Sequence, residues 1–232
     1  MPTSTDSPRT TGERLRPPTA VAAICGALLT ALVVATLAVH RAPLRVDEVV
    51  HGWVLTHRPS WSAHLAAAIT VTGSGVPAYA LAALAGALAV DARRWLGALL
   101  GLLALLSAQL PRLVLVSTIA RPRPPHADWA SSASGAALPS GHATTSMVVA
   151  LLLTLAVHRS VHGGSRRWLF PVPVTWAVVV GLTRVHLGVH WATDVMAGWL
   201  LAWCWAGCAM IVVLLLRRWK PGVFTTTERH RT

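Results

Sequence analysis

Two histidines and one aspartate have the types and spacing needed for covalent chemistry. His190 and Asp194 are four residues apart, which places them on one face of a helix. A carboxylate at Nδ1–H fixes the imidazole tautomer and leaves Nε2 as the attacking atom. A second histidine, His142, can protonate a departing alkoxide. These three residues are therefore the predicted catalytic group.

The residues around them predict that the reacting group is an anion. Arg123 and Arg184 carry forked donors that fit phosphate oxygens. Ser140 and Gly141 precede an apolar stretch, where the free N–H groups of a helix start bind anions and glycine lets the backbone approach a ligand. No carboxylate cluster suited to Mg²⁺ accompanies them. We therefore expect phosphoryl transfer to a side-chain nucleophile, with no metal and no other cofactor.

A metal site is the alternative for the histidines. His186, His190 and Asp194 are spaced four apart and could present a metal-binding face. Gly188 lies between the two histidines and indicates a turn. The nearby Arg184 would also repel a cation, so the phosphate interpretation is favoured.

The elements that position these residues are those of a membrane protein. The 232 residues are 54% hydrophobic and only 12% charged, against about 25% charged in an ordinary soluble domain. A helix needs about 20 apolar residues to cross a bilayer core of about 30 Å. The sequence predicts an all-α, integral-membrane six-helix bundle with spans near residues 20–39, 65–90, 95–116, 143–157, 168–182 and 195–216. The second span is broken at Gly73-Ser74-Gly75, and the fourth is short unless Ser140 to His142 form its first turn.

The basic residues predict the orientation of this bundle. The balance of 20 Lys+Arg to 8 Asp+Glu gives a net charge of +12, which in a soluble protein would indicate a nucleic-acid partner. Most of these cations lie in the two ends of the chain and in the turns near residues 93–94 and 159–167. Short cytoplasmic segments are rich in Arg and Lys. We therefore expect cytoplasmic tails at residues 1–18 and 219–232, a membrane domain at 19–218, an outward-facing site and no nucleic-acid partner. The first apolar run is too long for a cleavable signal and is interpreted as a retained anchor.

The polar motifs resemble those of a known family. Pro139-Ser140-Gly141-His142, and Arg184 followed after five residues by His190 and after three more by Asp194, are similar to the second and third motifs of the type 2 phosphatidic acid phosphatases. That family of membrane lipid phosphatases shares its active site with vanadium-dependent haloperoxidases. Arg123-Pro124 is similar to the end of its first motif.

The resemblance implies a role for each residue. His190 would form a phosphohistidine, Asp194 would orient it, and His142 would be the general acid. The phosphate would be bound by Arg123, Ser140, Gly141 and Arg184.

One position departs from the family pattern. The first motif has a lysine seven residues before Arg123, where this chain has Val116. Arg112 lies one turn earlier, about 6 Å along a helix, but its side chain is expected to tilt toward the cytoplasmic end. Arg121 is closer to the motif and is the predicted replacement in phosphate binding.

Together these features predict an enzyme of the bacterial cytoplasmic membrane that acts at the outer face. Its partners would be membrane lipids and a lipid phosphate or diphosphate substrate. The resemblance implies undecaprenyl diphosphate, phosphatidic acid or phosphatidylglycerol phosphate as that substrate. A non-catalytic lipid-phosphate binding or transport protein that keeps the anion site is the alternative, favoured by the absent lysine.

Overall fold

The computed structural model describes residues 11–90 and 93–219. All regular elements in this part of the chain are helical. They are α1 (Thr11–Ala38), α2 (Arg45–Thr56), α3 (Ser60–Val71), α4 (Gly75–Ala89), α5 (Arg94–Ile119), the 3₁₀ turn η1 (His126–Asp128), α6 (Gly141–Ser160), α7 (Ser165–Leu169), α8 (Val172–His186) and α9 (Ala192–Trp219).

The long helices have the length and composition of membrane spans. Five segments qualify alone, and the pair α3–α4, bent by 48° at its break, makes a sixth. Large apolar side chains such as Leu110, Val114 and Val212 point outward along these helices, where hydrocarbon would surround them. The chain is therefore a multi-pass membrane protein.

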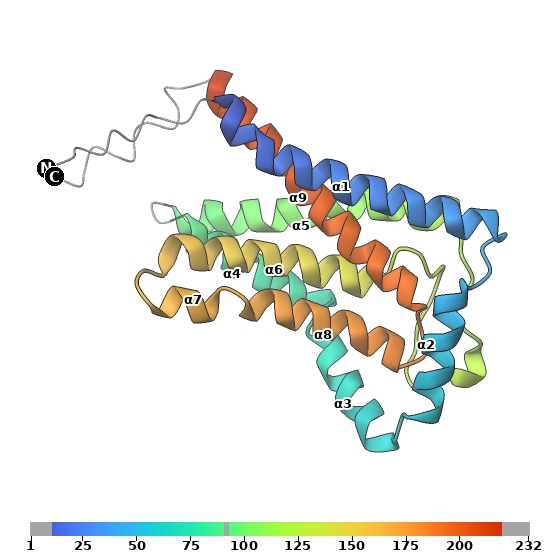
Figure 1. The fold of residues 1–232 in the computed structure, drawn as a ribbon. Coiled ribbons are helices and arrows are strands. Elements are labelled where there is room, and N and C mark those ends of the chain that lie inside the picture. The colour runs from blue at the N-terminus through green and yellow to red at the C-terminus, as the bar shows by residue number, and fades with distance from the viewer. Residues whose placement is uncertain (1–10, 91–92, 220–232) are drawn as a thin grey trace, which may run out of the picture.

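Small residues let the spans pack closely. A β-carbon at Gly86 of α4 would lie 2.0 Å from the carbonyl oxygen of Gly97 in α5, and one at Gly101 would lie 2.1 Å from that of Ala82. The backbones of α4 and α5 thus touch, as small residues allow in membrane helix pairs. Helix α1 packs along α9, while α6 contacts α4, α8 and α9 and occupies the centre (Figure 1).

One end of the bundle collects the polar motifs. Helices α5 and α8 end there, α6 and α9 begin there, and α2 lies across it (Figure 1). The opposite end holds the α4–α5 turn, the α6–α8 connection and the end of α9. Arginines gather at this opposite end, among them Arg93, Arg94, Arg159, Arg166, Arg167, Arg217 and Arg218.

The predicted spans are confirmed as helices, with three differences. Helix α1 starts at Thr11, inside the stretch predicted as a tail, while residues 1–10 and 220–232 lie outside the described residues. Helix α5, with Pro111 inside it, continues three residues beyond the predicted span, to Ile119. Helix α2 was not predicted, because its 12 residues are too short and too polar for a span.

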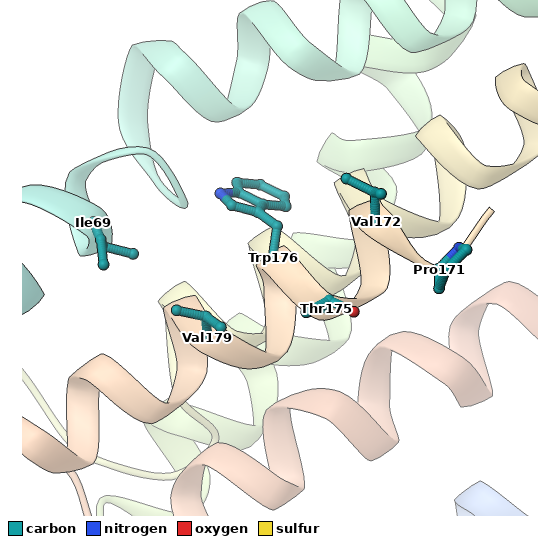
Figure 2. A pocket seen from close by; sticks show the side chains of 6 residues that line it. All are labelled: Ile69, Pro171, Val172, Thr175, Trp176 and Val179. Carbon is teal, nitrogen blue, oxygen red and sulfur yellow. The ribbon is translucent and has the colours of Figure 1, made fainter. Parts of the chain in front are cut away.

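A hollow of about 450 Å³ lies where the end of α3 meets α8. It is lined by Ile69, Pro171, Val172, Thr175, Trp176 and Val179, and Figure 2 shows the Trp176 indole above α8. The Trp176 Nε1–H donates to the Thr72 hydroxyl at 3.0 Å and so ties α8 to the α3–α4 break. The hollow contains none of the residues predicted to do chemistry.

Candidate active site

His190 lies in the short loop between α8 and α9, beside Asp194 in the first turn of α9. Its Nδ1 is 3.4 Å from Asp194 Oδ2, longer than a typical hydrogen bond. The prediction that both residues share a helix face is wrong, because α9 begins only at Ala192. Gly188, with a φ of 72°, makes the turn that redirects the chain before His190. The two side chains still meet because the Trp191 N–H donates to Asp194 Oδ2 at 2.9 Å and closes the helix start.

Asp194 is also held from its other oxygen. Its Oδ1 accepts from Arg121 Nη1 at 2.7 Å, and both side chains are completely buried. Arg121 Nη2 in turn donates to Asp47 Oδ2 at 2.7 Å. Asp47 further accepts from the backbone N–H and the hydroxyl of Thr193 at 2.9 Å and 2.8 Å. The orienting carboxylate is therefore part of a buried ionic network that joins α2, the segment after α5, and α9.

Arg123 reaches the other ring nitrogen of His190. Its Nη1 lies 2.8 Å from Nε2, an arrangement in which the guanidinium donates to the ring nitrogen. The same side chain donates to the carbonyls of Ser134, Gly135, Ala136 and Val189 at 2.7–3.3 Å. The loop between α5 and α6 thus wraps around Arg123 and holds its charge at the nitrogen that would attack.

The start of α6 faces the same place. Ser140 caps the helix without using its side chain, and its buried Oγ has no hydrogen-bond partner among the described residues. The Ser140 N–H donates to the backbone carbonyl of Asp194 at 3.0 Å, which ties the two motifs together. Gly198 makes this approach possible, because a β-carbon there would lie 2.9 Å from both the Ser140 carbonyl and the Ala143 methyl. The free N–H groups of the first turn form an anion-binding end.

His142 occupies the first turn of α6 and bonds to the break in the second span. Its Nε2 is 2.9 Å from the hydroxyl of Ser74, the residue just before α4. The charges of Arg123 and Arg184 act on its ring, as does that of His190. The α3–α4 break therefore places Ser74 where it can orient His142.

Arg184 completes the group from the last turn of α8. It is 4% exposed, its Nη1 donates to the Thr70 hydroxyl at 3.3 Å, and its Nε has no partner among the described residues. No carboxylate of the described residues pairs with Arg123 or Arg184. Two buried or half-buried guanidinium groups without a counter-ion are costly, and a bound phosphate would neutralise them.

The electrostatics favour a neutral His190. Burial lowers the pKa of His190 to about 4; the hydrogen bond and charge of Asp194 oppose the shift, and the charges of Arg123 and Arg184 add to it. Burial also lowers the pKa of Arg123, with Asp194 opposing and the charge of Arg112 adding to the effect. At neutral pH the His190 ring is thus uncharged, as a nucleophile requires.

The structure brings seven of the eight predicted site residues close together: His142, His190, Asp194, Arg123, Arg184, Ser140 and Gly141. Arg121 is placed behind them, because both of its terminal nitrogens bind carboxylates and the residue is fully buried. This geometry gives it a positioning role instead of the predicted contact with phosphate. His186 points elsewhere and bonds to the Ser62 hydroxyl at 2.9 Å.

Several participants were missed from the sequence. Asp47, Thr193 and Ser74 contact the predicted residues directly. Asp47 had a weak signal, because it is one of only eight acids in the chain. Ser74 had none beyond its place in a helix break.

Comparisons with known proteins agree with the motifs. The model of the PAP2 superfamily matches residues 95–218, more than half of the chain. The chain therefore belongs to this superfamily, which is the type 2 phosphatidic acid phosphatase family, and it is classed with the lipid phosphate phosphatases.

Two curated relatives show how far the similarity extends. Phosphatidylglycerophosphatase B of Bacillus subtilis is 30% identical over 176 residues, which cover 75% of this chain and 84% of that protein. An undecaprenyl-diphosphatase of Sulfolobus acidocaldarius is 43% identical over 65 residues, which span only 27% of each chain.

A solved structure shares the fold. The crystal structure of the transmembrane PAP2-type phosphatidylglycerolphosphate phosphatase from Bacillus subtilis superposes with a TM-score of 0.70. It is 24% identical and the match covers 88% of this chain and 98% of that one.

Proposed function

We propose that this protein hydrolyses a lipid phosphate or diphosphate through a phosphohistidine, without a metal. The observation that carries the proposal is the convergence of His190, Arg123 and Arg184 on the open start of α6. The Nε2 of His190 is turned away from Asp194 and toward Arg123, the first group that would bind a phosphate oxygen.

The reaction would proceed in two steps. In the first, Nε2 of His190 attacks the terminal phosphorus, the bond from that phosphorus to the leaving oxygen breaks, and protonated His142 gives its proton to that oxygen. The leaving group is the lipid alcohol of a monophosphate or the lipid phosphate of a diphosphate. In the second, water attacks the phosphorus of the phosphohistidine, the bond from phosphorus to Nε2 breaks, His142 takes a proton from the water, and inorganic phosphate leaves. Arg123, Arg184 and the α6 N–H groups would neutralise charge on the phosphoryl oxygens in both steps.

Asp194 would act on His190 throughout. Its carboxylate keeps the proton on Nδ1 and stabilises the positive charge that the ring gains when Nε2 bonds to phosphorus. Arg121 and Asp47 hold this carboxylate in place.

The substrate would be a lipid that reaches the site from the bilayer. Phosphatidylglycerol phosphate and undecaprenyl diphosphate, the substrates in the names of the two relatives, and phosphatidic acid are the compounds to test. The arginines at the opposite end of the bundle support an outward-facing site in a bacterial cytoplasmic membrane.

A non-catalytic lipid-phosphate binding or transport protein is the second candidate. Val116 in place of the family lysine is the observation that favours it. The two candidates differ in turnover alone, since both bind phosphate at the same place.

The test is phosphate release by purified protein in detergent with excess chelator. We expect hydrolysis of at least one of the three lipids, inhibition by vanadate, and loss of activity in His190→Ala. His57→Ala is the matched control, because His57 is exposed and bonds only to its own helix end. Undiminished turnover by His190→Ala would contradict the phosphohistidine. Loss of turnover in chelator would indicate a metal, and phosphate binding without turnover would indicate the second candidate.

A further inference from the structure

Arg112 is a cation at the site that the mechanism above does not use. It lies in the middle of α5, and its Nε is buried without a hydrogen-bond partner. No hydrogen bond or ion pair joins its guanidinium to any residue that the structure describes. The Tyr79 side chain of α4 lies close enough to interact electrostatically with Arg112, but it is uncharged at neutral pH. Arg112 is thus a half-buried charge that lacks a counter-ion.

The guanidinium of Arg112 lies directly against the start of α6. A β-carbon added to Gly141 would be 2.7 Å from Nη2 and 3.0 Å from Nε of Arg112. Gly141 therefore leaves room for the arginine as well as for a ligand. The charge of Arg112 also acts on Arg123 and on His142, so Arg112 belongs to the same group of cationic and imidazole side chains.

The register between α5 and α6 explains why Arg112, and not Val116, lies beside Gly141 at the start of α6. One turn deeper, Gln109 donates to the hydroxyl of Thr145 at 3.2 Å. The antiparallel helices therefore place Arg112 opposite Gly141. The next turn of α5, at Leu115, packs against the apolar cluster that includes Leu138, which precedes α6. The Arg112 side chain tilts back toward the N-terminal end of α5. It still meets the first turn of α6, because α6 begins beside Arg112 and not beside the C-terminal end of α5.

We propose that Arg112 binds the substrate phosphate at the start of α6 and replaces the cation that Val116 cannot supply. Arg112, Arg123 and Arg184 then form three guanidinium donors around one phosphoryl group. Arg121 does not compete for this role, because Asp47 and Asp194 occupy both of its terminal nitrogens. The inference rests on the proposed function for its substrate but requires only that phosphate binds.

The experiment compares Arg112→Met, Arg112→Lys and the wild type. Methionine keeps much of the length and removes the charge, while lysine keeps the charge. Arg94→Met is the matched control, because it removes an exposed arginine at the far end of the same helix. Two quantities are measured in detergent: kcat/KM for a lipid phosphate, and the affinity for inorganic phosphate and vanadate by calorimetry or competition.

We expect Arg112→Met to lower kcat/KM by about 100-fold or more, the cost of removing one donor to a transition-state oxyanion. The same variant should bind inorganic phosphate and vanadate about 10-fold more weakly or worse, since each 1.4 kcal/mol is a factor of ten. Arg112→Lys should stay within about 10-fold of the wild type in both, because an ammonium group also binds phosphate as a point charge. Arg94→Met should match the wild type.

Unchanged phosphate and vanadate affinity in a folded Arg112→Met protein would overturn the proposal, whatever happens to turnover. A variant that unfolds is detected by size-exclusion profile and thermal midpoint, and Arg112→Lys then decides: the proposal requires that it bind both anions within about 10-fold of the wild type, and a greater loss overturns it. If the wild type binds phosphate through Arg112 but hydrolyses no lipid, the proposed function fails and the assignment of Arg112 stands.

Discussion

Asp194 accepts hydrogen bonds from three directions, and this determines how firmly it can orient His190. Arg121 and the Trp191 N–H hold its two oxygens at 2.7 Å and 2.9 Å, while the His190 ring is more distant at 3.4 Å. A carboxylate held by other groups can receive the imidazole proton bond without moving when charge develops on the ring. In the proposed mechanism, the preorganised carboxylate would therefore lower the cost of forming the phosphohistidine.

Asp47 should contribute to catalysis without touching substrate. Asp47→Asn keeps the side-chain shape but removes the charge that shares Arg121 with Asp194, so Arg121 is free to shift. Because partners behind a reacting group typically contribute about 10–100-fold, we expect kcat to fall by about that range with KM nearly unchanged. Loss of one partner of a buried ion pair should also destabilise the fold by about 3–5 kcal/mol.

Steady-state kinetics at lipid concentrations below and above KM, together with a thermal melt, check this prediction. Glu48→Gln is the control, because Glu48 pairs with Arg45 on the exposed side of the same helix. A rise in KM with normal kcat would mean that Asp47 affects binding instead of orientation.

The sequence predicted which residues belong to the site better than it predicted which residues they contact. The motifs around His190 and Asp194, and the order of Ser140, Gly141 and His142, selected residues that the structure brings close together. The choice between Arg121 and Arg112 required the α5–α6 register. Register depends on how Gln109, Gly141 and Leu115 pack, and no local pattern contains that information.

Among the elements, the crossing of α6 and α9 brings two motifs into one site. Gly198 lets the backbone of α9 approach the Ser140 carbonyl, so that the Ser140 N–H reaches the carbonyl of Asp194. The α6 start and the His190 loop are therefore positioned by a contact one turn deeper in the bundle.

Gly198→Val should separate these helices. Its β-carbon would clash with the Ser140 carbonyl and the Ala143 methyl at 2.9 Å, and overpacking of this kind costs about 1–3 kcal/mol. Since small displacements of reacting groups cost about 100-fold in rate, activity should fall far more than stability. The assay is kcat/KM beside a thermal melt.

Gly52→Val serves as the comparison for this variant, because a β-carbon at Gly52 of α2 meets nothing within 4 Å. Equal activity of the two valine variants would show that the α6–α9 approach does not position the site.

Hydropathy predicted the spans because a membrane helix must be long and apolar. It could not predict α2, whose acidic first turn and mixed faces resemble a polar loop. The Gly73–Gly75 break was visible in the sequence, but its consequence was not: the bend places Ser74 beside His142.

At the scale of the whole molecule, the arginine cluster that includes Arg93, Arg94, Arg166 and Arg217 lies at the end of the bundle opposite the site. The positive-inside rule then predicts that the site faces outward. In a cysteine-free variant, Ala127→Cys at the site end should react with a membrane-impermeant maleimide added to intact cells. His162→Cys, exposed at the other end, should react only after the membrane is permeabilised. The reversed labelling pattern would place the site in the cytoplasm.

The buried network of Asp47, Arg121 and Asp194 has a consequence for biogenesis. Its three charges come from α2, from the segment after α5 and from α9, so they meet only after α9 has been synthesised. Until α9 enters the membrane, Arg121 has only one of its two carboxylates and His190 has no Asp194 to orient it. Under the proposed function, a nascent chain that stops before α9 would lack both the network and the orienting carboxylate, and we expect it to be inactive.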